Sequence, residues 1–120
     1  MRKSILYIED NSDNRLLVRR ILEAEGYRVL EAADGETGIA LVQTDQPDLI
    51  LMDINLPDID GYEVTRRLRA IPELAEVPIL ALTANALKGD REKSLDAGCN
   101  SYIRKPIDVD AFPQQISEYL

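Results

Sequence analysis

Short, uninterrupted apolar runs alternate along this chain with longer segments in which apolar residues recur every three or four positions. Two of the runs, LILM at 49–52 and ILAL at 79–82, are apolar throughout, as strands buried on both faces of a sheet must be. Parallel strands need long crossover connections, and the helical segments between the runs supply them. The alternation therefore predicts an α/β fold in which helices cover both faces of a parallel sheet.

Five strands and five helices are predicted, in alternation. Strands are expected at Ile5–Ile8, Tyr27–Ala32, Leu49–Met52, Ile79–Leu82 and Ser101–Arg104. Helices are expected from near Leu17 to Gly26, over 35–43, from Asp60 to Pro72, from about Leu87 to Ala97, and around Phe112 to Tyr119. We expect the doubly wound strand order 2-1-3-4-5, which makes the first and third strands neighbours and places a ligand beyond their carboxyl ends.

Three of the helices carry more specific predictions. The fourth has almost no apolar stripe, so little burial anchors it, and we expect it to be the most mobile helix. Pro113 interrupts the last helix unless it lies in the first turn, which favours Asp110 as the cap. The apolar face of the first helix is predicted to include Leu17, Val18, Ile21, Leu22 and Ala24.

Length and charge limit the classes of function. The 120 residues fit one domain with one core, expected to span 1–120. A formal net charge of -8 opposes binding to nucleic acid or to an anionic membrane. The nearest basic cluster, Arg66, Arg67 and Arg69, falls in a helical pattern and is interpreted as a solvated face.

Cysteine usage and hydropathy indicate the compartment. The single cysteine, Cys99, cannot form an internal disulfide and is interpreted as a small, semi-buried filler. No apolar run approaches the roughly 20 residues of a membrane span, and acids interrupt the N-terminal apolar stretch too early for a signal peptide. We expect a soluble, cytoplasmic protein.

Polar side chains come at the ends of four of the predicted strands. Because the carboxyl ends of parallel strands meet at one edge of the sheet, these groups are expected to lie together there. Scattered polar residues would fall at both ends of the strands. The residues concerned are Glu9 and Asp10 after the first strand, Asp53 after the third, Thr83 at the end of the fourth and Lys105 after the fifth.

Three carboxylates at one edge imply a cation. Two carboxylates about 5 Å apart repel by about 3 kcal/mol at an effective dielectric constant near 20, and Lys105 cannot reach all three equally. Oxygen ligands without histidine or thiolate favour a hard ion, and a site that leaves room for water suits Mg²⁺ better than Ca²⁺. Taken alone, Glu9 and Asp13 could equally be solvated residues or helix caps, and that alternative stays open for them.

A carboxylate beside Mg²⁺, facing a hydroxyl and an ammonium group, can attack a phosphoryl donor and become an acyl phosphate. Asp53 is the best candidate for the nucleophile because it lies between the metal-binding acids and the side of Thr83 and Lys105. Asp10 is better placed as a metal ligand.

Four motifs in order resemble the receiver domains of two-component response regulators, over essentially the whole chain. They are YIEDN at 7–11, LILMDINLPDIDGYE at 49–63, ALTANA at 81–86 and YIRKPID at 102–108. The resemblance implies a flavodoxin-like (βα)5 fold and a phosphoryl switch. Asp53 would accept a phosphoryl group from a histidine kinase or a histidine phosphotransfer protein. The chain would assist its own phosphorylation and dephosphorylation without being a dedicated enzyme.

The resemblance also assigns roles to single residues. Asp10, Asp53 and the backbone carbonyl of Asn55 would bind Mg²⁺, and Glu9, where many members of the family have Asp, would act through water. The remaining assignments are Lys105 as the partner of the acceptor and then of the phosphoryl group, Pro106 after a cis peptide bond, Thr83 as the hydroxyl that moves to a phosphoryl oxygen, Tyr102 as the switch aromatic and Gly61 as the opening of the third helix.

The fourth helix, fifth strand and last helix would then form an output face that binds a downstream protein, or the phosphoryl group would pass to a second histidine. We expect a standalone receiver that is a monomer or a phosphorylation-dependent dimer, although a receiver from a hybrid kinase would look the same.

One rival is a Mg²⁺-dependent phosphatase with an aspartyl nucleophile, which should carry Asp-x-Asp after the first strand and a cap domain. The other is a module that docks partners independently of phosphorylation, yet Asp53 and Lys105 are both present.

Overall fold

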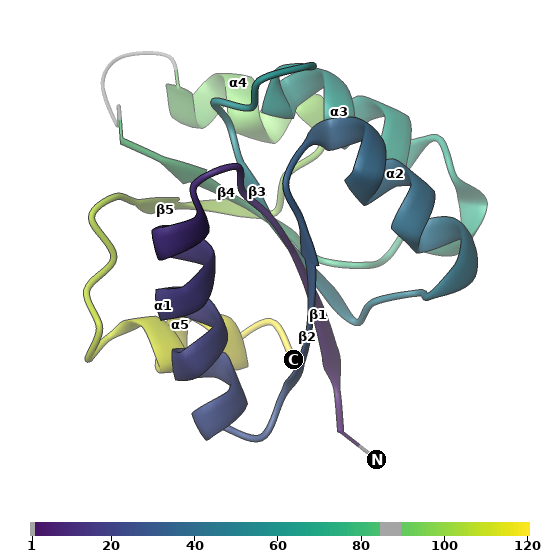
Figure 1. Cartoon of the computed structure of the whole chain (residues 1–120). Helices are drawn as coiled ribbons and strands as arrows, with labels where there is room; N and C mark the ends of the chain where they lie inside the picture. The colour runs from purple at the N-terminus through teal and green to yellow at the C-terminus, as the bar shows by residue number, and fades with distance from the viewer. Residues whose placement is uncertain (1, 85–89) are drawn as a thin grey trace.

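The computed structural model describes residues 2–84 and 90–120, in which strands and helices alternate along the chain (Figure 1). The first three predicted residues of the fourth helix, 87–89, lie outside these ranges. The elements are β1 (Ser4–Ile8), α1 (Ser12–Ala24), β2 (Arg28–Ala32), α2 (Gly35–Thr44), β3 (Leu49–Asp53), α3 (Gly61–Arg69), a 3-10 turn η1 (Pro72–Leu74), β4 (Ile79–Thr83), α4 (Asp90–Ala97), β5 (Ser101–Arg104) and α5 (Phe112–Ser117).

The strands form one parallel sheet in the order β2-β1-β3-β4-β5, which confirms the predicted topology. Asp53 pairs in register with Leu82, and Thr83 pairs with Arg104. Asp53 and Thr83 are therefore the last residues of their strands, one position further than the predicted ends. Continued pairing holds both at the carboxyl edge of the sheet.

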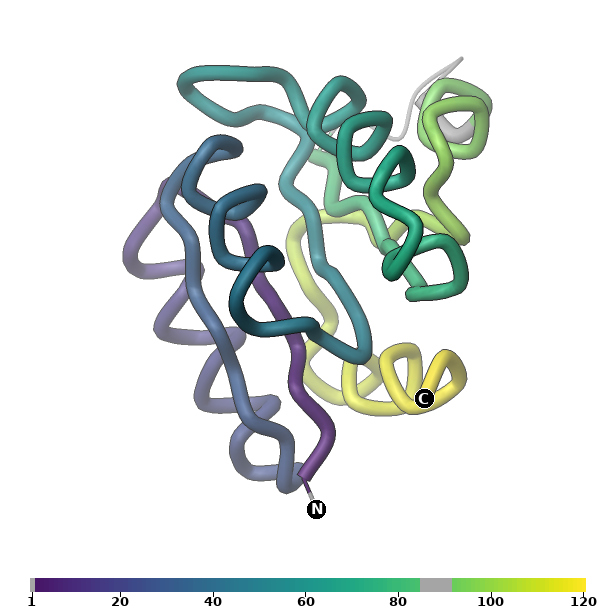
Figure 2. The backbone as a smooth tube through the Cα atoms, turned by 90° about the vertical axis from the view of Figure 1, so that its right-hand side faces the viewer, coloured from purple at the N-terminus to yellow at the C-terminus, as the bar shows by residue number. Residues whose placement is uncertain are grey.

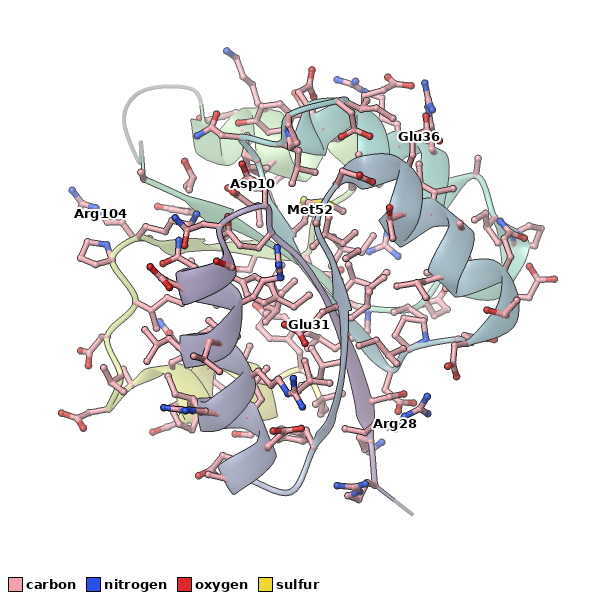
Figure 3. The ribbon with its side chains drawn as sticks, viewed as in Figure 1. Asp10, Arg28, Glu31, Glu36, Met52 and Arg104 are labelled. Carbon is pink, nitrogen blue, oxygen red and sulfur yellow. The ribbon has the colours of Figure 1, made fainter. Side chains whose placement is uncertain are left out.

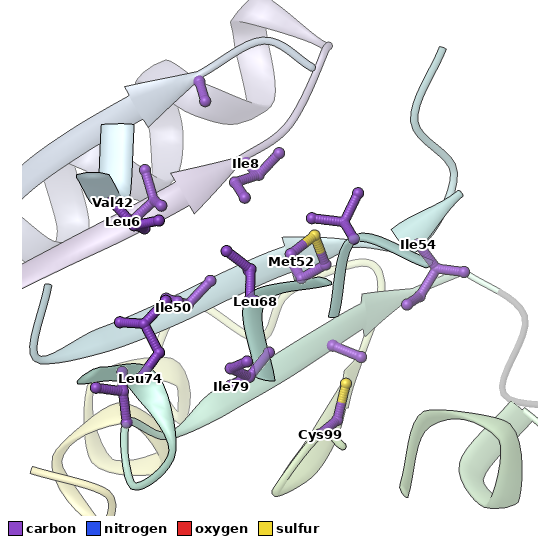
Figure 4. Close-up of a cluster of buried hydrophobic side chains, with 14 residues drawn as sticks. Leu6, Ile8, Val42, Ile50, Met52, Ile54, Leu68, Leu74, Ile79 and Cys99 are labelled. Carbon is purple, nitrogen blue, oxygen red and sulfur yellow. The ribbon is translucent and has the colours of Figure 1, made fainter. Parts of the chain in front are cut away.

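Helices cover both faces of the sheet, with α1 and α5 on one side and α2, α3 and α4 on the other (Figures 1 and 2). Successive side chains of a strand point to opposite faces, so each strand contributes to two separate cores. In β1, Ile5 and Tyr7 pack with the residues of α1 and α5. Leu6 and Ile8 pack on the opposite side with residues of α2 and α3 (Figure 4).

The first helix buries a narrower face than predicted. Val18 and Leu22 are completely buried, whereas Leu17 is 45% exposed and Ala24 is also exposed. The helix contacts the sheet along one seam, so positions one residue away from that seam remain at the surface. Its predicted end is confirmed, because Gly26 follows it with a positive φ of 92°.

The caps of two helices were predicted with different success. The side chain of Asp60 accepts a hydrogen bond from the Glu63 N–H at the start of α3, as expected. Asp110 was the wrong choice for α5, whose cap is Ala111. The carboxylate of Asp108 instead accepts from the N–H groups of Asp110 and Ala111 and orders the turn before the helix.

Among the helices within 2–84 and 90–120, none is long and apolar enough to cross a lipid bilayer.

Candidate functional site

Three carboxylates meet at the carboxyl edge of the sheet. Glu9 and Asp10 follow β1 and Asp53 ends the neighbouring β3, and one oxygen from each lies within 4.8 Å of the other two. Glu9 and Asp53 are 1% and 3% exposed, whereas Asp10 is exposed. Figure 3 shows Asp10 at this end of the sheet and Arg28 at the opposite end. The predicted gathering of the three acids is thus present in the structure.

Lys105 contacts two of the three acids. Its ammonium nitrogen lies 2.9 Å from Oε1 of Glu9 and 3.3 Å from Oδ1 of Asp53. The peptide bond between Lys105 and Pro106 is cis, as the resemblance implies. The lysine thus offsets the charge of the two buried acids and leaves the exposed Asp10 to solvent or to a cation.

Burial and close contact change the acidity of these groups. Burial raises the pKa of Asp53 to about 7, and a shared hydrogen bond with Glu9 adds to this effect. Burial alone would also raise the pKa of Glu9, but hydrogen bonds from Asp53 and Lys105 outweigh it and hold that pKa below its ordinary value. The same two acids raise the pKa of Lys105 against the effect of burial. Glu9 therefore keeps its charge more firmly than Asp53.

Hydrogen bonds to backbone groups hold the turns that follow β1 and β3. One guanidinium nitrogen of Arg15 donates to the carbonyl oxygens of Glu9 and Asp10, at 2.7 and 3.2 Å. The N–H of Asn55 donates to Oδ1 of Asp53 at 3.2 Å. These contacts fix the turns that follow β1 and β3, so the acids are positioned by the backbone as well as by their side chains.

Thr83 and Tyr102 lie on the β4 and β5 side of the site. Thr83 is buried at the end of β4, and its carbonyl accepts a hydrogen bond of 2.8 Å from the Lys105 N–H. Tyr102 is half-buried in β5 and packs against the core beneath α2 and α3. Both residues are where the resemblance places them, and their switching roles stay predictions.

The loop between β3 and α3 is tied to a neighbouring helix. Both carboxylate oxygens of Asp58 accept hydrogen bonds from the start of α2, from the N–H of Gly35 at 2.9 Å and from that of Glu36 at 3.0 Å. At the C-terminal end of the loop, the N–H of Gly61 donates to the Ile54 carbonyl at 2.9 Å. The segment after the candidate acceptor is therefore held near its middle and at its C-terminal end.

A cavity of about 480 Å³ lies beside the site, between α1 and the segment after β5. Lys105 and Tyr7 contribute to its wall together with largely apolar neighbours. The remaining lining residues are Asn14, Leu17, Val18, Ala84, Pro106 and Ile107.

Three contributors were missed from sequence. The hydroxyl of Tyr7 donates to Oε1 of Glu9 at 3.0 Å. The guanidinium of Arg15 donates to backbone carbonyls after β1, and the carboxylate of Asp58 accepts from the start of α2. A tyrosine between aliphatic residues of a buried strand is itself a signal, since its hydroxyl needs a partner. Arg15 and Asp58 bind backbone groups of other turns, and no motif or spacing in the sequence indicates these contacts.

The donor set fits a hard divalent cation. Oxygen atoms of three carboxylates converge, two of them buried, and neither imidazole nor thiolate is among the converging groups. Such oxygen donors suit Mg²⁺. Burial of two acids so close together is costly in free energy unless positive charge is nearby, and Lys105 supplies only part of it.

Comparisons with known proteins agree with this geometry. The family described as response regulator receiver domain matches residues 5–117. Over 120 residues the chain is 44% identical to the polar-differentiation response regulator DivK of Brucella anthropi, covering the whole of this chain and 98% of that protein.

Solved structures show the same likeness. The receiver domain of a sensor histidine kinase from Pseudomonas aeruginosa, crystallised with a magnesium ion coordinated in its active-site cleft, superposes with a TM-score of 0.91 at 41% identity, covering 99% of this chain and 98% of that one. The chemotaxis protein CheY4 of Vibrio cholerae superposes with a TM-score of 0.96 at 26% identity over the full length of both chains.

Proposed function

Because the chain belongs to the family of response regulator receiver domains, we propose that it is a signalling switch whose Asp53 accepts a phosphoryl group from a phosphohistidine. The observation that carries the proposal is the convergence of three carboxylates and Lys105 at one edge of the sheet. Asp53 contacts the lysine and lies beside both other acids, as Glu9 also does, and its position in the motif at 49–63 favours it as the acceptor.

The transfer consists of one displacement at phosphorus. A carboxylate oxygen of Asp53 forms the new P–O bond as the P–N bond to the donor histidine breaks. The second ring nitrogen of that histidine carries a proton, so the imidazole leaves as a neutral group. Lys105 lies 3.3 Å from Oδ1 of Asp53, close enough to stabilise the negative charge of the transferring phosphoryl group.

Mg²⁺ would be held by Asp10, Asp53 and the backbone carbonyl of Asn55, with Glu9 acting through water. When bound, the ion neutralises negative charge on the phosphoryl oxygens. The magnesium ion in the active-site cleft of the Pseudomonas aeruginosa receiver supports this assignment. Asp10 is exposed, so its carboxylate is accessible to an ion from solvent.

Thr83 and Tyr102 would couple phosphorylation of Asp53 to a change at the surface. The Thr83 hydroxyl would bind a phosphoryl oxygen, and Tyr102 would change its packing as the threonine moves. The face formed by α4, β5 and α5 would then change its affinity for a downstream protein. This proposal is supported by the position of both residues on the strands next to the site.

We propose a single domain over 1–120 that acts in the cytoplasm as a monomer or a phosphorylation-dependent dimer, without a dedicated enzymatic activity of its own. Its partners would be a histidine kinase or phosphotransfer protein and a downstream target, or a second histidine that takes the phosphoryl group. A receiver module of a hybrid kinase is the alternative, since the Pseudomonas aeruginosa relative is part of a sensor kinase.

The test is the intact mass of the protein after incubation with acetyl phosphate, with and without Mg²⁺. The wild type should gain one phosphoryl group with Mg²⁺, and Asp53→Asn should gain none. Asp45→Asn is the matched control, because Asp45 pairs with Arg28 at the opposite end of the sheet (Figure 3), and it should behave as the wild type. An unchanged mass gain in Asp53→Asn would refute the assignment.

A further inference from the structure

Tyr7 is a polar aromatic residue between aliphatic neighbours in β1. It is completely buried in β1 and packs with the core residues beneath α1 and α5. Tyr7 and Glu9 are two positions apart, so their side chains leave the strand on the same side. The hydroxyl of Tyr7 consequently reaches Oε1 of Glu9, at 3.0 Å.

The two oxygens of Glu9 have different surroundings. Oε1 accepts from the Tyr7 hydroxyl and also from the Lys105 ammonium group, at 2.9 Å. Oε2 accepts a long hydrogen bond, of 3.4 Å, from the N–H of Asn11, and Glu9 also shares a hydrogen bond with the side chain of Asp53. Oε1 is therefore committed to the lysine side of the site, and Oε2 is the oxygen with remaining capacity to accept.

We propose that Tyr7 is a positioning residue, which holds Glu9 in the orientation that turns Oε1 toward Lys105 and leaves Oε2 to accept from a water bound to the cation. This inference rests on the proposed function and adds a residue to it. A glutamate has one more rotatable bond than an aspartate, so its carboxylate needs an external donor to keep one orientation. Lys105 alone cannot provide this, because it is shared with Asp53.

The test compares Mg²⁺ affinity by calorimetric titration in the wild type, Tyr7→Phe and Tyr27→Phe. Tyr7→Phe keeps the ring in the core and removes only the hydroxyl. Loss of such an outer-shell donor weakens metal binding by about tenfold or more, and we expect about tenfold here. Tyr27 packs against the same core and is not among the residues that contact Glu9, so Tyr27→Phe should bind Mg²⁺ as the wild type does.

A double-mutant comparison separates positioning from a general effect on the fold. In a Glu9→Ala background, Tyr7→Phe should cause no further loss of Mg²⁺ affinity, because the group that it orients is gone. An equal further loss in that background would overturn the inference. Mg²⁺ affinity of Tyr7→Phe within about twofold of the wild type would overturn it as well, since outer-shell donors are worth more.

The wild type provides a measurement that does not depend on the folding of any variant. Addition of Mg²⁺ should shift the NMR signals of the Tyr7 ring and leave those of Tyr27 in place. Tyr7 signals that stay fixed at saturating Mg²⁺ would contradict the inference alone. A wild type that takes up no Mg²⁺ would refute the metal site of the proposed function, and this inference with it.

Discussion

Gly61 shows how a single residue can decide where the candidate acceptor lies. A Cβ at this position would be 2.7 Å from Cα of Ile54 and 2.8 Å from the carbonyl oxygen of Asp53. Both are backbone atoms, which cannot rotate away as the end of a side chain can. The N–H of Gly61 also donates to the Ile54 carbonyl at 2.9 Å, which brings the start of α3 close to the end of β3.

We therefore expect Gly61→Ala to lower the free energy of unfolding by about 2 kcal/mol, as overpacking of an interior typically does. The change should also slow phosphorylation, because relief of the contact displaces Asp53. Gly26→Ala is the comparison, since a Cβ there meets no atom within 4 Å and only the positive φ is unfavourable. It should destabilise the protein without slowing phosphorylation. Chemical denaturation and intact mass measure the two effects, and equal phosphorylation rates of both variants would contradict the expectation.

The residues that carry charge in the site could be predicted from sequence, whereas those that orient them could not. Asp53 and Glu9 follow apolar runs, and the strand order alone places them at one edge. The hydrogen bonds of the Tyr7 hydroxyl and the Arg15 guanidinium depend on side-chain rotamers and on the three-dimensional positions of their acceptors. The periodicity of the sequence does not indicate either. Only the isolated polar group of Tyr7 in a buried strand could have indicated a partner.

At the scale of elements, Arg69 joins three segments that are far apart in the chain. From the end of α3, its guanidinium donates to the carbonyl oxygens of Leu74 and Val77, near η1, at 2.7 and 2.6 Å. It also donates to the Gly98 carbonyl at 2.9 Å and to the Asn100 side chain at 2.7 Å, between α4 and β5. With the Ala75 carbonyl, at 3.4 Å, five acceptors thus depend on one half-buried side chain.

Arg69→Lys should lower the free energy of unfolding by about 2 to 3 kcal/mol, because an ammonium group cannot reach all of these acceptors and each lost hydrogen bond costs about 1 kcal/mol. Arg66→Lys provides the control with the same chemical change. Arg66 is 58% exposed and pairs with Glu63 three positions away, so its replacement should cost less than about 0.5 kcal/mol. Urea denaturation of both variants measures the difference, and similar losses would show that the Arg69 contacts contribute little.

The hydrogen bonds between Asp58 and the start of α2 should make the free energy of unfolding depend on pH. Hydrogen bonds from the N–H groups of Gly35 and Glu36 outweigh slight burial and hold the pKa of Asp58 below its ordinary value. A carboxylate with a lowered pKa in the folded state stabilises the protein above its unfolded pKa of about 4, and this contribution disappears as pH falls through the lower, folded value. Asp58→Asn should therefore cost about 1 kcal/mol near neutral pH, because the amide keeps one acceptor oxygen but its NH2 group cannot accept from the second N–H.

The measurement is the free energy of unfolding of wild type and Asp58→Asn at a series of pH values. The two curves should converge as pH falls below about 4, where the wild-type carboxyl group becomes protonated. Asp110→Asn makes the same substitution at an exposed site and should follow the wild type throughout. A constant difference between wild type and Asp58→Asn over the whole range would exclude the ionised carboxylate as its cause.

The strands and α-helices within 2–84 and 90–120 were predicted in type and order, whereas the 3-10 turn η1 was not predicted and the ends were predicted less well. The central strands are apolar runs in the sequence, and the helical segments between strands predict a parallel sheet, for which 2-1-3-4-5 is a common order. The cap of α5 was wrong because a turn of hydrogen bonds around Asp108 precedes the helix, and sequence spacing does not distinguish that turn from a helix start. The inward face of α1 depends on its rotation on the sheet, which is set by packing against β1 and β2.

At the scale of the whole molecule, the sheet brings together groups from distant parts of the sequence. Glu9 and Lys105, which lie within 2.9 Å of each other, come from opposite ends of the chain. Two cores pack on either side of the sheet, and Figure 4 shows the one beneath α2 and α3. They hold β1, β3 and β5 in place, and the register of these strands places the acids and the lysine. The site is therefore a property of the fold, and a loss of either core should disperse it.

The most direct test is to identify the residue that carries the phosphoryl group. Wild-type protein treated with acetyl phosphate and Mg²⁺ is reduced with borohydride, which converts an aspartyl phosphate into homoserine, and the digested peptides are sequenced by mass spectrometry. Our account predicts homoserine at position 53 and none when Mg²⁺ is removed by chelation. Homoserine at another aspartate, or at position 53 in equal amount without Mg²⁺, would contradict it.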